Sequence, residues 1–168
     1  MLIRPATPED IPAITAIYNS AVLNSTASFD VEPKSIEDRH RWLAQRLPQH
    51  PVLVAEEDAA ILGWGALSPY SERAAYARTA EVSVYVEDGY QMRGIGRAVS
   101  LALLQAAARA GFHAILARIC TGNAASLAMM RSLGFTEAGT LREVGCKFGR
   151  WLDVVTWEFI VGDEPCVS

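Results

Sequence analysis

The pattern that decides this fold lies in residues 80–97, which read AEVSVYVEDGYQMRGIGR. Apolar residues alternate with others as far as Val86, as in a β-strand with one buried face, and a helical pattern begins at Gly94 and Gly96. The first N–H groups of a helix have no partner within it, and the helix dipole makes that end positive. A strand, a glycine-containing turn and a helix in this order therefore predict an anion site, which a phosphate can approach because glycine has no Cβ atom.

The glycine turn does not match the two best-known phosphate motifs. A dinucleotide-binding fingerprint requires a third small residue where Val99 stands, and a P-loop requires Gly-Lys-Ser or Gly-Lys-Thr, which the sequence lacks. Glycine pairs are also common in plain turns, so the pair by itself leaves that alternative open. Arg93 and Arg97 add positive charge beside the glycines and favour a phosphorylated ligand of another kind.

The rest of the chain predicts a mixed β-sheet covered by helices. Strand–helix–strand units between residues 80 and 141 predict parallel pairing, and the strands between residues 52 and 86 predict an antiparallel meander. We expect one α/β (α+β) domain over residues 1–162, with a mixed, mostly antiparallel sheet of about seven strands flanked by about four helices, and a tail at 163–168. The expected strands are residues 2–4, 52–56, 61–67, 80–86, 114–120, 135–141 and 152–161, and the expected helices are residues 8–22, 36–47, 94–110 and 124–133.

Composition excludes several classes of protein. The chain has 168 residues, of which 51% are hydrophobic and 20% charged, which is enough for a core in one domain. A formal net charge of −4 argues against nucleic-acid binding, which needs a basic surface. No apolar run is long enough to cross a membrane, and the N-terminus has no signal-peptide pattern, so we expect a cytoplasmic protein.

The cysteines and histidines form no recognisable metal or disulfide pattern. The three cysteines lie far apart, and the three histidines are equally scattered. We therefore expect no bound metal, with Cys120 as a small core residue and with His40, His50 and His113 at the surface or at helix ends.

Two motifs together resemble the GNAT superfamily of acetyltransferases. Gln91-x-x-Gly94-x-Gly96, after the strand Val84-Tyr85-Val86, is similar to the acetyl-CoA motif of that superfamily. The run Asn123-Ala124-Ala125-Ser126, followed by Leu133-Gly134-Phe135, resembles its next motif. The similarity extends over residues 2–160, and the two motifs in this order and spacing are more specific than either alone.

A narrower resemblance joins the chain to the phosphinothricin and methionine sulfone/sulfoximine N-acetyltransferases. It rests on Ile17-Tyr18-Asn19, Thr26-Ala27-Ser28-Phe29, Thr79-Ala80-Glu81 and Lys147-Phe148-Gly149-Arg150-Trp151-Leu152-Asp153-Val154. The resemblance implies the GNAT fold, acetyl-CoA as the acetyl donor, a small amino-acid-like amine as the acceptor, and a homodimer. The C-terminal strand also favours a dimer, because it carries more large apolar groups than one sheet face easily covers: Trp151, Val154, Trp157 and Phe159.

The resemblance also implies where acetyl-CoA binds. The backbone of residues 84–86 would pair with the pantetheine arm, and the N–H groups of residues 92–97 would hold the pyrophosphate. Asn123 would contact the cofactor near its reactive end. The expected cofactor site comprises Val84, Tyr85, Val86, Gln91, Met92, Arg93, Gly94, Ile95, Gly96, Arg97, Asn123 and Ser126.

Glu81 is the candidate general base. Acetyl transfer needs a neutral amine, and an α-amine is mostly protonated at neutral pH, so a group in the protein must take its proton. Glu81 is a lone carboxylate in an apolar strand, on the same face as Ser83 and Tyr85, and the resemblance places the catalytic carboxylate of the group at this position. The alternative is a solvated acid on an edge strand.

An amino-acid-like acceptor also carries a carboxylate. Arg73 and Arg78, in the loop before residue 80, are candidates to bind it in a bidentate fork, or else are solvated loop residues. Phe29 is a candidate apolar wall, or else a residue that covers the core. The expected substrate site comprises Phe29, Arg73, Arg78, Glu81, Val82 and Ser83.

The chain departs from these relatives at three positions. Many GNAT enzymes have a proton-donating Tyr, and members of the narrower group often a His, where this chain has Met130, so a water or Tyr85 is left as the general acid. Phe148 and Leu152 stand where some phosphinothricin enzymes have His, which weakens the case for phosphinothricin as the best acceptor. Acetylation of a protein N-terminus or another amine stays open, as does a CoA-binding sensor without turnover.

Overall fold

A seven-stranded mixed sheet forms the centre of the molecule and confirms the expected fold class. The computed structural model describes residues 1–162, so the expected tail at 163–168 lies outside the described residues. The strands lie in the order β1-β2-β3-β4-β5-β7-β6, and within this range β4 and β5 are the one pair that runs parallel. Their bounds are β1 Leu2–Pro5, β2 Val52–Glu57, β3 Ala60–Pro69, β4 Thr79–Val86, β5 Ala114–Cys120, β6 Thr136–Lys147 and β7 Arg150–Ile160.

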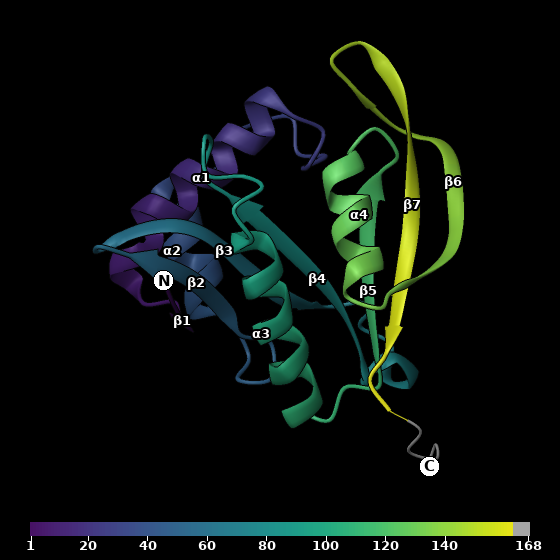
Figure 1. Ribbon diagram of the computed structural model, residues 1–168, viewed down its shortest axis with the longest axis horizontal. Helices are drawn as coiled ribbons and strands as arrows, with labels where there is room; N and C mark the ends of the chain where they lie inside the picture. Colours follow the sequence, from purple (N-terminus) through teal and green to yellow (C-terminus); the bar gives the residue numbers. More distant parts are fainter. Residues whose placement is uncertain (163–168) are drawn as a thin grey trace.

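Within residues 1–162, four α-helices cover the two faces of the sheet (Figure 1). α1 (Ile11–Asn24) and α2 (Ile36–Ala44) lie on one face, and α3 (Ile95–Arg109) and α4 (Ala124–Ser132) lie on the other. Ser35 begins α2 by accepting a hydrogen bond from the Asp38 N–H at 3.0 Å. Two short 3-10 turns, Pro8–Asp10 and Ala74–Tyr76, complete the described helical structure.

Each face of the sheet has its own hydrophobic core. α1 packs against β2 and β3 through fully buried residues such as Ile11 and Ile14, and α3 packs on the opposite face through Val99 and Leu103. α3 lies close to the sheet because β3 has Gly65 at the contact, where a Cβ atom would come within 2.8 Å of Leu103 and 2.9 Å of Val99. Burying one such aliphatic side chain stabilises the fold by about 1.5–3 kcal/mol, so these contacts fix α3 on the sheet.

The strands β4 and β5 pair over a short distance and then separate (Figure 1). The pairing covers residues 79–81 of β4 and 114–116 of β5 and ends at Glu81 and Leu116. Beyond that point β4 continues beside β3, and β5 continues beside β7. The facing edges of the two strands therefore border a gap in the sheet, with backbone N–H and carbonyl groups turned toward it.

The second strand–helix–strand unit does not form the parallel pair that the sequence predicted. β7 lies between β5 and β6 and is antiparallel to both, so β5 and β6 run in the same direction without pairing. The cause is the turn at Phe148 and Gly149, whose φ angles of 52° and 70° suit a tight hairpin that folds β7 back on β6. β7 then fills the place beside β5 with the buried side chains of Val155 and Trp157.

Some expected boundaries and one expected surface residue are also wrong. The helix expected to reach residue 47 ends at Ala44, and the strand expected at 135–141 extends to Lys147 because its hairpin partner pairs with it that far. His50 is 7% exposed, with its ring centroid 5.1 Å from that of Phe112, and this burial lowers its pKa. Cys120 is buried, as expected.

Neither a metal site nor a membrane span is found in the part of the chain that the structure describes. Within residues 1–162, no group of three or more His, Cys, Asp or Glu side chains could hold a metal ion. No helix in the same range is long and apolar enough to cross a membrane.

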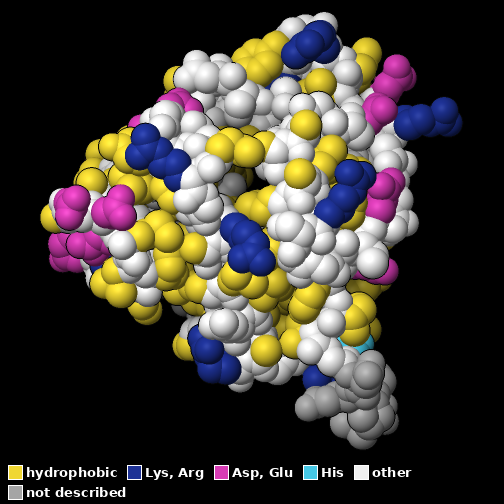
Figure 2. Space-filling view, viewed as in Figure 1, with side chains coloured by type: hydrophobic (Ala, Val, Ile, Leu, Met, Phe, Trp, Pro, Cys, Tyr) yellow, Lys and Arg dark blue, Asp and Glu magenta, His cyan; other side chains and the backbone are white. Residues whose placement is uncertain are grey.

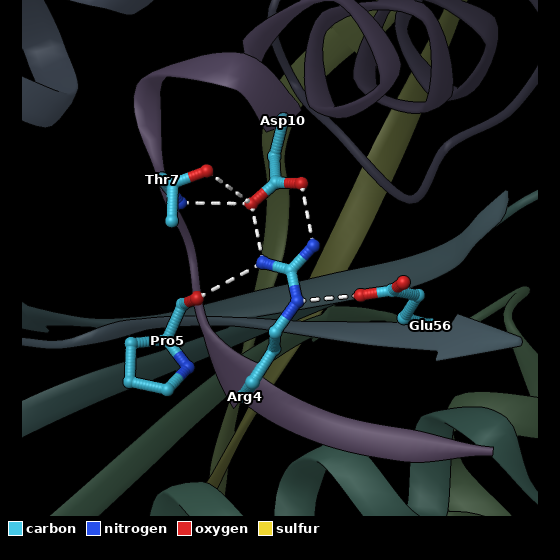
Figure 3. A network of polar contacts seen from close by, with 5 residues as sticks. All are labelled: Arg4, Pro5, Thr7, Asp10 and Glu56. Carbon is cyan, nitrogen blue, oxygen red and sulfur yellow. Dashed lines mark hydrogen bonds and ion pairs between the residues drawn. The ribbon is translucent and has the colours of Figure 1, made fainter. Parts of the chain in front are cut away.

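An ion-pair network ties the first strand to the start of the first helix (Figure 3). The guanidinium of Arg4 in β1 donates two hydrogen bonds to the carboxylate of Asp10, at 2.7 and 2.9 Å, and a third to Glu56 in β2. Asp10 is buried and also accepts hydrogen bonds from the N–H and the hydroxyl of Thr7, at 2.8 and 3.2 Å. The carboxylate of Asp10 therefore closes the turn that leads into α1.

Asp10→Asn should lower the free energy of unfolding at neutral pH by about 1–3 kcal/mol, because the Arg4 guanidinium loses one of its two charged partners and keeps only Glu56. Hydrogen bonds from Arg4 hold the pKa of Asp10 below its ordinary value. The charge of Asp10 therefore stabilises the fold above its unfolded pKa of about 4, and this contribution is lost as pH falls through the lower folded pKa. In urea denaturation, the stability difference between wild type and variant should shrink below about pH 4.

Glu72→Gln is the control for this measurement, because it removes an exposed carboxylate from the loop before β4. It should change the free energy of unfolding little at any pH. A constant difference between wild type and Asp10→Asn over the whole range would mean that Asp10 stabilises through its shape and not through its charge.

Candidate active site

Two cavities meet in the gap between β4 and β5. The turn cavity, of about 560 Å³, runs from the turn before α3 along α1 and α4, and the strand cavity, of about 370 Å³, lies between β4, β5 and residues 26–30. Figure 2 shows a hollow near the middle of the viewed face of the molecule, bordered by hydrophobic side chains. Both cavities are lined by Ala27, Val84, Tyr85, Asn123, Ser126 and Met129, so they form one passage.

The turn cavity reaches the N-terminus of α3, where the sequence predicted an anion site. Gly94 begins the helix with a φ of 82°, which residues other than glycine rarely adopt, and a Cβ atom there would meet nothing within 4 Å. The first hydrogen bond of α3 runs from the Ala98 N–H to the Gly94 carbonyl oxygen, at 2.9 Å. The N–H groups of residues 95–97 therefore have no partner within the helix and, with the helix dipole, suit a phosphate.

Gln91 shapes the turn that precedes α3. Its side-chain amide donates a hydrogen bond to the Asp88 carboxylate and accepts one from the Gly89 N–H, both at 2.9 Å. Asp88 also accepts a hydrogen bond from the Ser20 hydroxyl of α1. The turn is thus tied to α1, which lines the turn cavity as well.

The other residues expected around the anion site differ in how they face it. Met92, Gly96 and Arg97 line the turn cavity. The Arg93 guanidinium instead lies 4.8 Å from the centroid of the Tyr90 ring. Ile95 is buried in the core, so its backbone N–H is the part that can face a ligand.

Past Glu81, the open edge of β4 runs between the two cavities. Val84 and Tyr85 line both cavities, and Val86 lines the turn cavity. An extended molecule can hydrogen-bond to such an edge as an added strand would. This edge is where the sequence resemblance places the pantetheine arm.

Glu81 and Arg118 form an ion pair in the wall of the strand cavity. The Nε–H of Arg118 donates to Oε1 of Glu81 at 3.0 Å, and Nη2 lies 2.8 Å from Oε2, so the guanidinium contacts both carboxylate oxygens. The side chain of Glu81 is 18% exposed and that of Arg118 is 58% exposed. Because the β4–β5 pairing ends at Leu116, the ion pair lies where the gap begins.

Residues 26–30 form another wall of the strand cavity, and Lys147 of β6 holds it in place. Lys147 is buried, and its Nζ donates hydrogen bonds to the carbonyl oxygens of Ser25 and Ser28, at 2.8 and 2.6 Å. Burial lowers the pKa of Lys147, and the negative charge of Asp30 acts in the opposite direction. The two carbonyl acceptors satisfy the buried ammonium and fix the backbone of this wall.

Three side chains complete this wall: Tyr18, Phe29 and Asp30. The carboxylate of Asp30 accepts a hydrogen bond from the Tyr18 hydroxyl at 2.7 Å and pairs with Lys34 Nζ at 2.9 Å. Burial acts to raise the pKa of Asp30, but these two partners outweigh it and leave the pKa below its ordinary value. The ring of Phe29 packs beside Gly145 of β6, where a Cβ atom would collide with it.

Tyr85 and Met130 both line the strand cavity and bear on the question of a proton donor. The Tyr85 ring stacks on Trp64 with 4.9 Å between centroids and meets Tyr18 edge-on at 5.1 Å. Burial raises the pKa of the Tyr85 hydroxyl well above its ordinary value, so this group stays protonated at neutral pH. The thioether of Met130 has no proton to donate. Tyr85 or a water therefore stays the candidate general acid.

The structure separates two of the expected acceptor residues from the rest. Within the described residues, neither Arg73 nor Arg78 lines either cavity, and Arg78 donates a hydrogen bond to the Gly111 carbonyl oxygen at 2.9 Å. Their contact with a substrate carboxylate stays a prediction. The other expected acceptor residues all line the strand cavity: Phe29, Glu81, Val82 and Ser83.

Sequence reasoning missed Arg118 and assigned no role to Lys147. Arg118 interrupts the otherwise apolar strand Ala114–Cys120, which is the same signal that drew attention to Glu81 in β4. The hydrogen-bond partners of Lys147 lie 119 and 122 residues away along the chain, so no local pattern could reveal them.

Comparison with known proteins identifies the same family that the sequence motifs indicated. The family model described as an acetyltransferase (GNAT) domain matches residues 3–156. The L-methionine sulfoximine/L-methionine sulfone acetyltransferase of Pseudomonas aeruginosa is 40% identical over 154 residues, which cover 90% of this chain and 90% of that protein. The phosphinothricin N-acetyltransferase of Streptomyces coelicolor is 38% identical over 160 residues, which cover 93% of this chain and 94% of that protein.

A solved structure shares the fold and holds the expected cofactor. The Salmonella typhimurium protein yncA, solved with its cofactor acetyl-CoA, superposes with a TM-score of 0.97 at 36% identity, over 100% of this chain and 98% of that one. The expected fold, acetyl donor and enzyme class are therefore confirmed. The chain belongs to the GNAT acetyltransferase family and is an acetyl-CoA-dependent N-acetyltransferase.

Proposed function

We propose that this enzyme acetylates the amino group of a small amino-acid-like acceptor of the methionine sulfone, methionine sulfoximine or phosphinothricin type. The observation that carries the proposal is the strand cavity, of about 370 Å³, which joins the turn cavity at Val84 and Tyr85 and has the Glu81 carboxylate in its wall. The names of the two relatives support this class of acceptor. A cytoplasmic location is part of the same proposal.

On the donor side, the proposal gives a place to three parts of acetyl-CoA, which are the pyrophosphate, the pantetheine arm and the reactive end. The N–H groups of residues 95–97, together with Arg97, which lines the turn cavity, would hold the pyrophosphate. The open edge of β4 at residues 84–86 would hold the pantetheine arm. Asn123 and Ser126 line both cavities, so they lie where the reactive end must pass. Acetyl-CoA, when bound, supplies the activated thioester.

On the acceptor side, Glu81 would take a proton from the acceptor's ammonium group, so that the neutral amine can attack the thioester carbonyl directly. Segment 26–30, held by Lys147, would keep the acceptor against β4 and exclude water. Tyr85, or a water, would supply the proton for the departing thiolate.

A homodimer is also part of this proposal. Of the apolar residues that suggested it, Val154 and Trp157 are buried in the molecule's own core, whereas Trp151 is 67% exposed. Trp151 belongs to a set of exposed apolar side chains on the β6–β7 hairpin, and exposed apolar groups of this kind favour an interface. The set, which we call the hairpin group, comprises Leu141, Val144, Phe148 and Trp151, each more than half exposed.

The enzyme should release thiol from acetyl-CoA when methionine sulfone, methionine sulfoximine or phosphinothricin is added. It should release much less with a peptide that presents an N-terminal alanine, because residues 26–30 wall the strand cavity. The N-acetylated forms of the same acceptors are matched controls, since they have no free amine. If the enzyme turned over the peptide but none of the three small acceptors, the proposed acceptor class would be overturned. Binding of acetyl-CoA without turnover of any acceptor would favour a CoA-binding sensor.

Glu81→Gln should lower kcat by about 10²–10⁴-fold, because the amide keeps the size of the carboxylate but cannot take a proton. The loss should shrink above about pH 8, as the acceptor's amine reaches its own pKa and arrives neutral. The measurement is kcat and KM for methionine sulfone over about pH 6 to 9.5. Glu137→Gln, at an exposed residue of β6 outside both cavities, should leave both constants unchanged.

Two other outcomes of this experiment would change the role of Glu81. A small loss of kcat at every pH would make its carboxylate structural. A raised KM with unchanged kcat would make it a binder of the ammonium group that takes no proton.

Sedimentation velocity at micromolar concentration should show a dimer of the 18.3 kDa chain. Trp151→Arg should shift the protein toward the monomer, because association would then bury an unpaired charge. Leu23→Arg, which places the same charge on an exposed apolar residue of α1, should leave the dimer intact. A wild-type protein that sediments as a single monomer-sized species would contradict this proposal.

A further inference from the structure

The ion pair of Glu81 and Arg118 occupies the place where an acceptor must bind. Glu81 lines the strand cavity and is the candidate general base, yet both of its carboxylate oxygens contact the Arg118 guanidinium, at 3.0 and 2.8 Å. The guanidinium takes up one acceptor position on each oxygen of Glu81, and its positive charge repels the acceptor's ammonium group. Movement of Arg118 away from Glu81 would therefore favour binding of the acceptor's ammonium group.

The ion pair does little for the stability of the fold. Arg118 is 58% exposed, and ion pairs at such positions contribute little because water screens them. The pair also lies just past the last backbone pairing of β4 and β5, at Glu81 and Leu116, where the strands separate. A charged side chain in the otherwise apolar strand β5 therefore has no evident structural purpose.

Arg118 is the positive charge that the strand cavity presents to a ligand. Among the described residues that line this cavity, it is the one Lys or Arg, and the acidic side chains are Asp30 and Glu81. Asp30 is engaged by the Tyr18 hydroxyl at 2.7 Å and by Lys34 at 2.9 Å. What remains for an acceptor is one carboxylate beside one guanidinium.

We propose that Arg118 binds the carboxylate of the acceptor while Glu81 receives its ammonium group, so that a zwitterionic head group opens the ion pair by replacing both partners. This inference rests on the proposed amino-acid-like acceptor and names the residue that selects it. The guanidinium suits a carboxylate because its planar fork offers two parallel N–H donors. Once Arg118 holds the acceptor's carboxylate, Glu81 is released to take the proton from the amine.

The same exchange gives the site a basis for rejecting other amines. An amine without a carboxylate offers Arg118 no new partner, so the guanidinium stays on Glu81 and competes with the incoming ammonium group. Arg118 thereby acts as a specificity-determining residue, since the acceptor's carboxylate is needed to free the base.

Methionine sulfone and its carboxamide test this assignment, because they share the amine and the side chain and differ in the carboxylate charge. Arg118→Gln should raise KM for methionine sulfone by about 10- to 100-fold, because charged hydrogen bonds are lost. KM for the carboxamide should fall instead, because the guanidinium no longer competes with its ammonium group for Glu81. Arg118→Lys keeps the charge without the fork and should fall between wild type and Arg118→Gln for methionine sulfone.

Arg109→Gln is the matched control, because it removes an exposed arginine of α3 that lines neither cavity. It should leave both KM values unchanged. If Arg118→Gln changes KM for the two acceptors by the same factor, or changes neither KM, then Arg118 does not bind the carboxylate and the inference is overturned. Turnover of methionine sulfone by the wild type would still support the proposed function in that case.

A wild-type enzyme that acetylates neither acceptor would instead overturn the proposed acceptor class. Calorimetric titration of the CoA-bound enzyme with methionine sulfone then decides the role of Arg118. Binding that the wild type shows and Arg118→Gln loses supports the inference. Equal binding by both proteins, or no binding by the wild type, overturns it.

Discussion

The separation of β4 from β5 after Glu81 is the constraint on which the rest of the structure depends. If the two strands had stayed paired to their ends, the open edge of β4 would be filled, and the turn cavity and the strand cavity would not meet. Because the pairing stops, the gap leaves room for the proposed arrangement, in which an extended donor would lie along β4 and an acceptor would enter beside Glu81. The gap would thus bring the two molecules together, which is the main requirement of the proposed direct transfer.

The walls of the gap are positioned by parts of the chain far from it. Lys147 lies on β6, which does not itself line either cavity within the described residues, yet its buried ammonium holds residues 25–28 through two carbonyl oxygens. A buried charge without partners would cost much free energy, so β6 and this wall are ordered together. The proposed sites for negatively charged groups are equally local: they are the N-terminus of α3 and Arg118, in a chain whose formal net charge is −4.

The features that depend on the order of residues in short stretches of the chain could be predicted from the sequence. The strand, turn and helix of residues 80–97 follow from alternation, glycine and helical spacing, and they place Gly94 at the start of α3 as expected. Seven strands and four helices within residues 1–162 also match the sequence pattern, because each element's own side chains favour it. Glu81 was recognisable as a lone carboxylate in an apolar strand, and it does line the strand cavity.

The sequence by itself therefore determined the helices and strands, the glycine turn before α3 and the family of this protein, since each depends on short runs of residues. Only the tertiary structure decided which strands became neighbours. The tight turn at Phe148 and Gly149 brings β7 beside β6, and the other edge of β7 then pairs with β5. Only the tertiary structure decided that Arg118 meets Glu81, 37 residues earlier, and that Arg73 lines neither cavity. Contacts between side chains so far apart depend on how the sheet twists and separates, which no local pattern specifies.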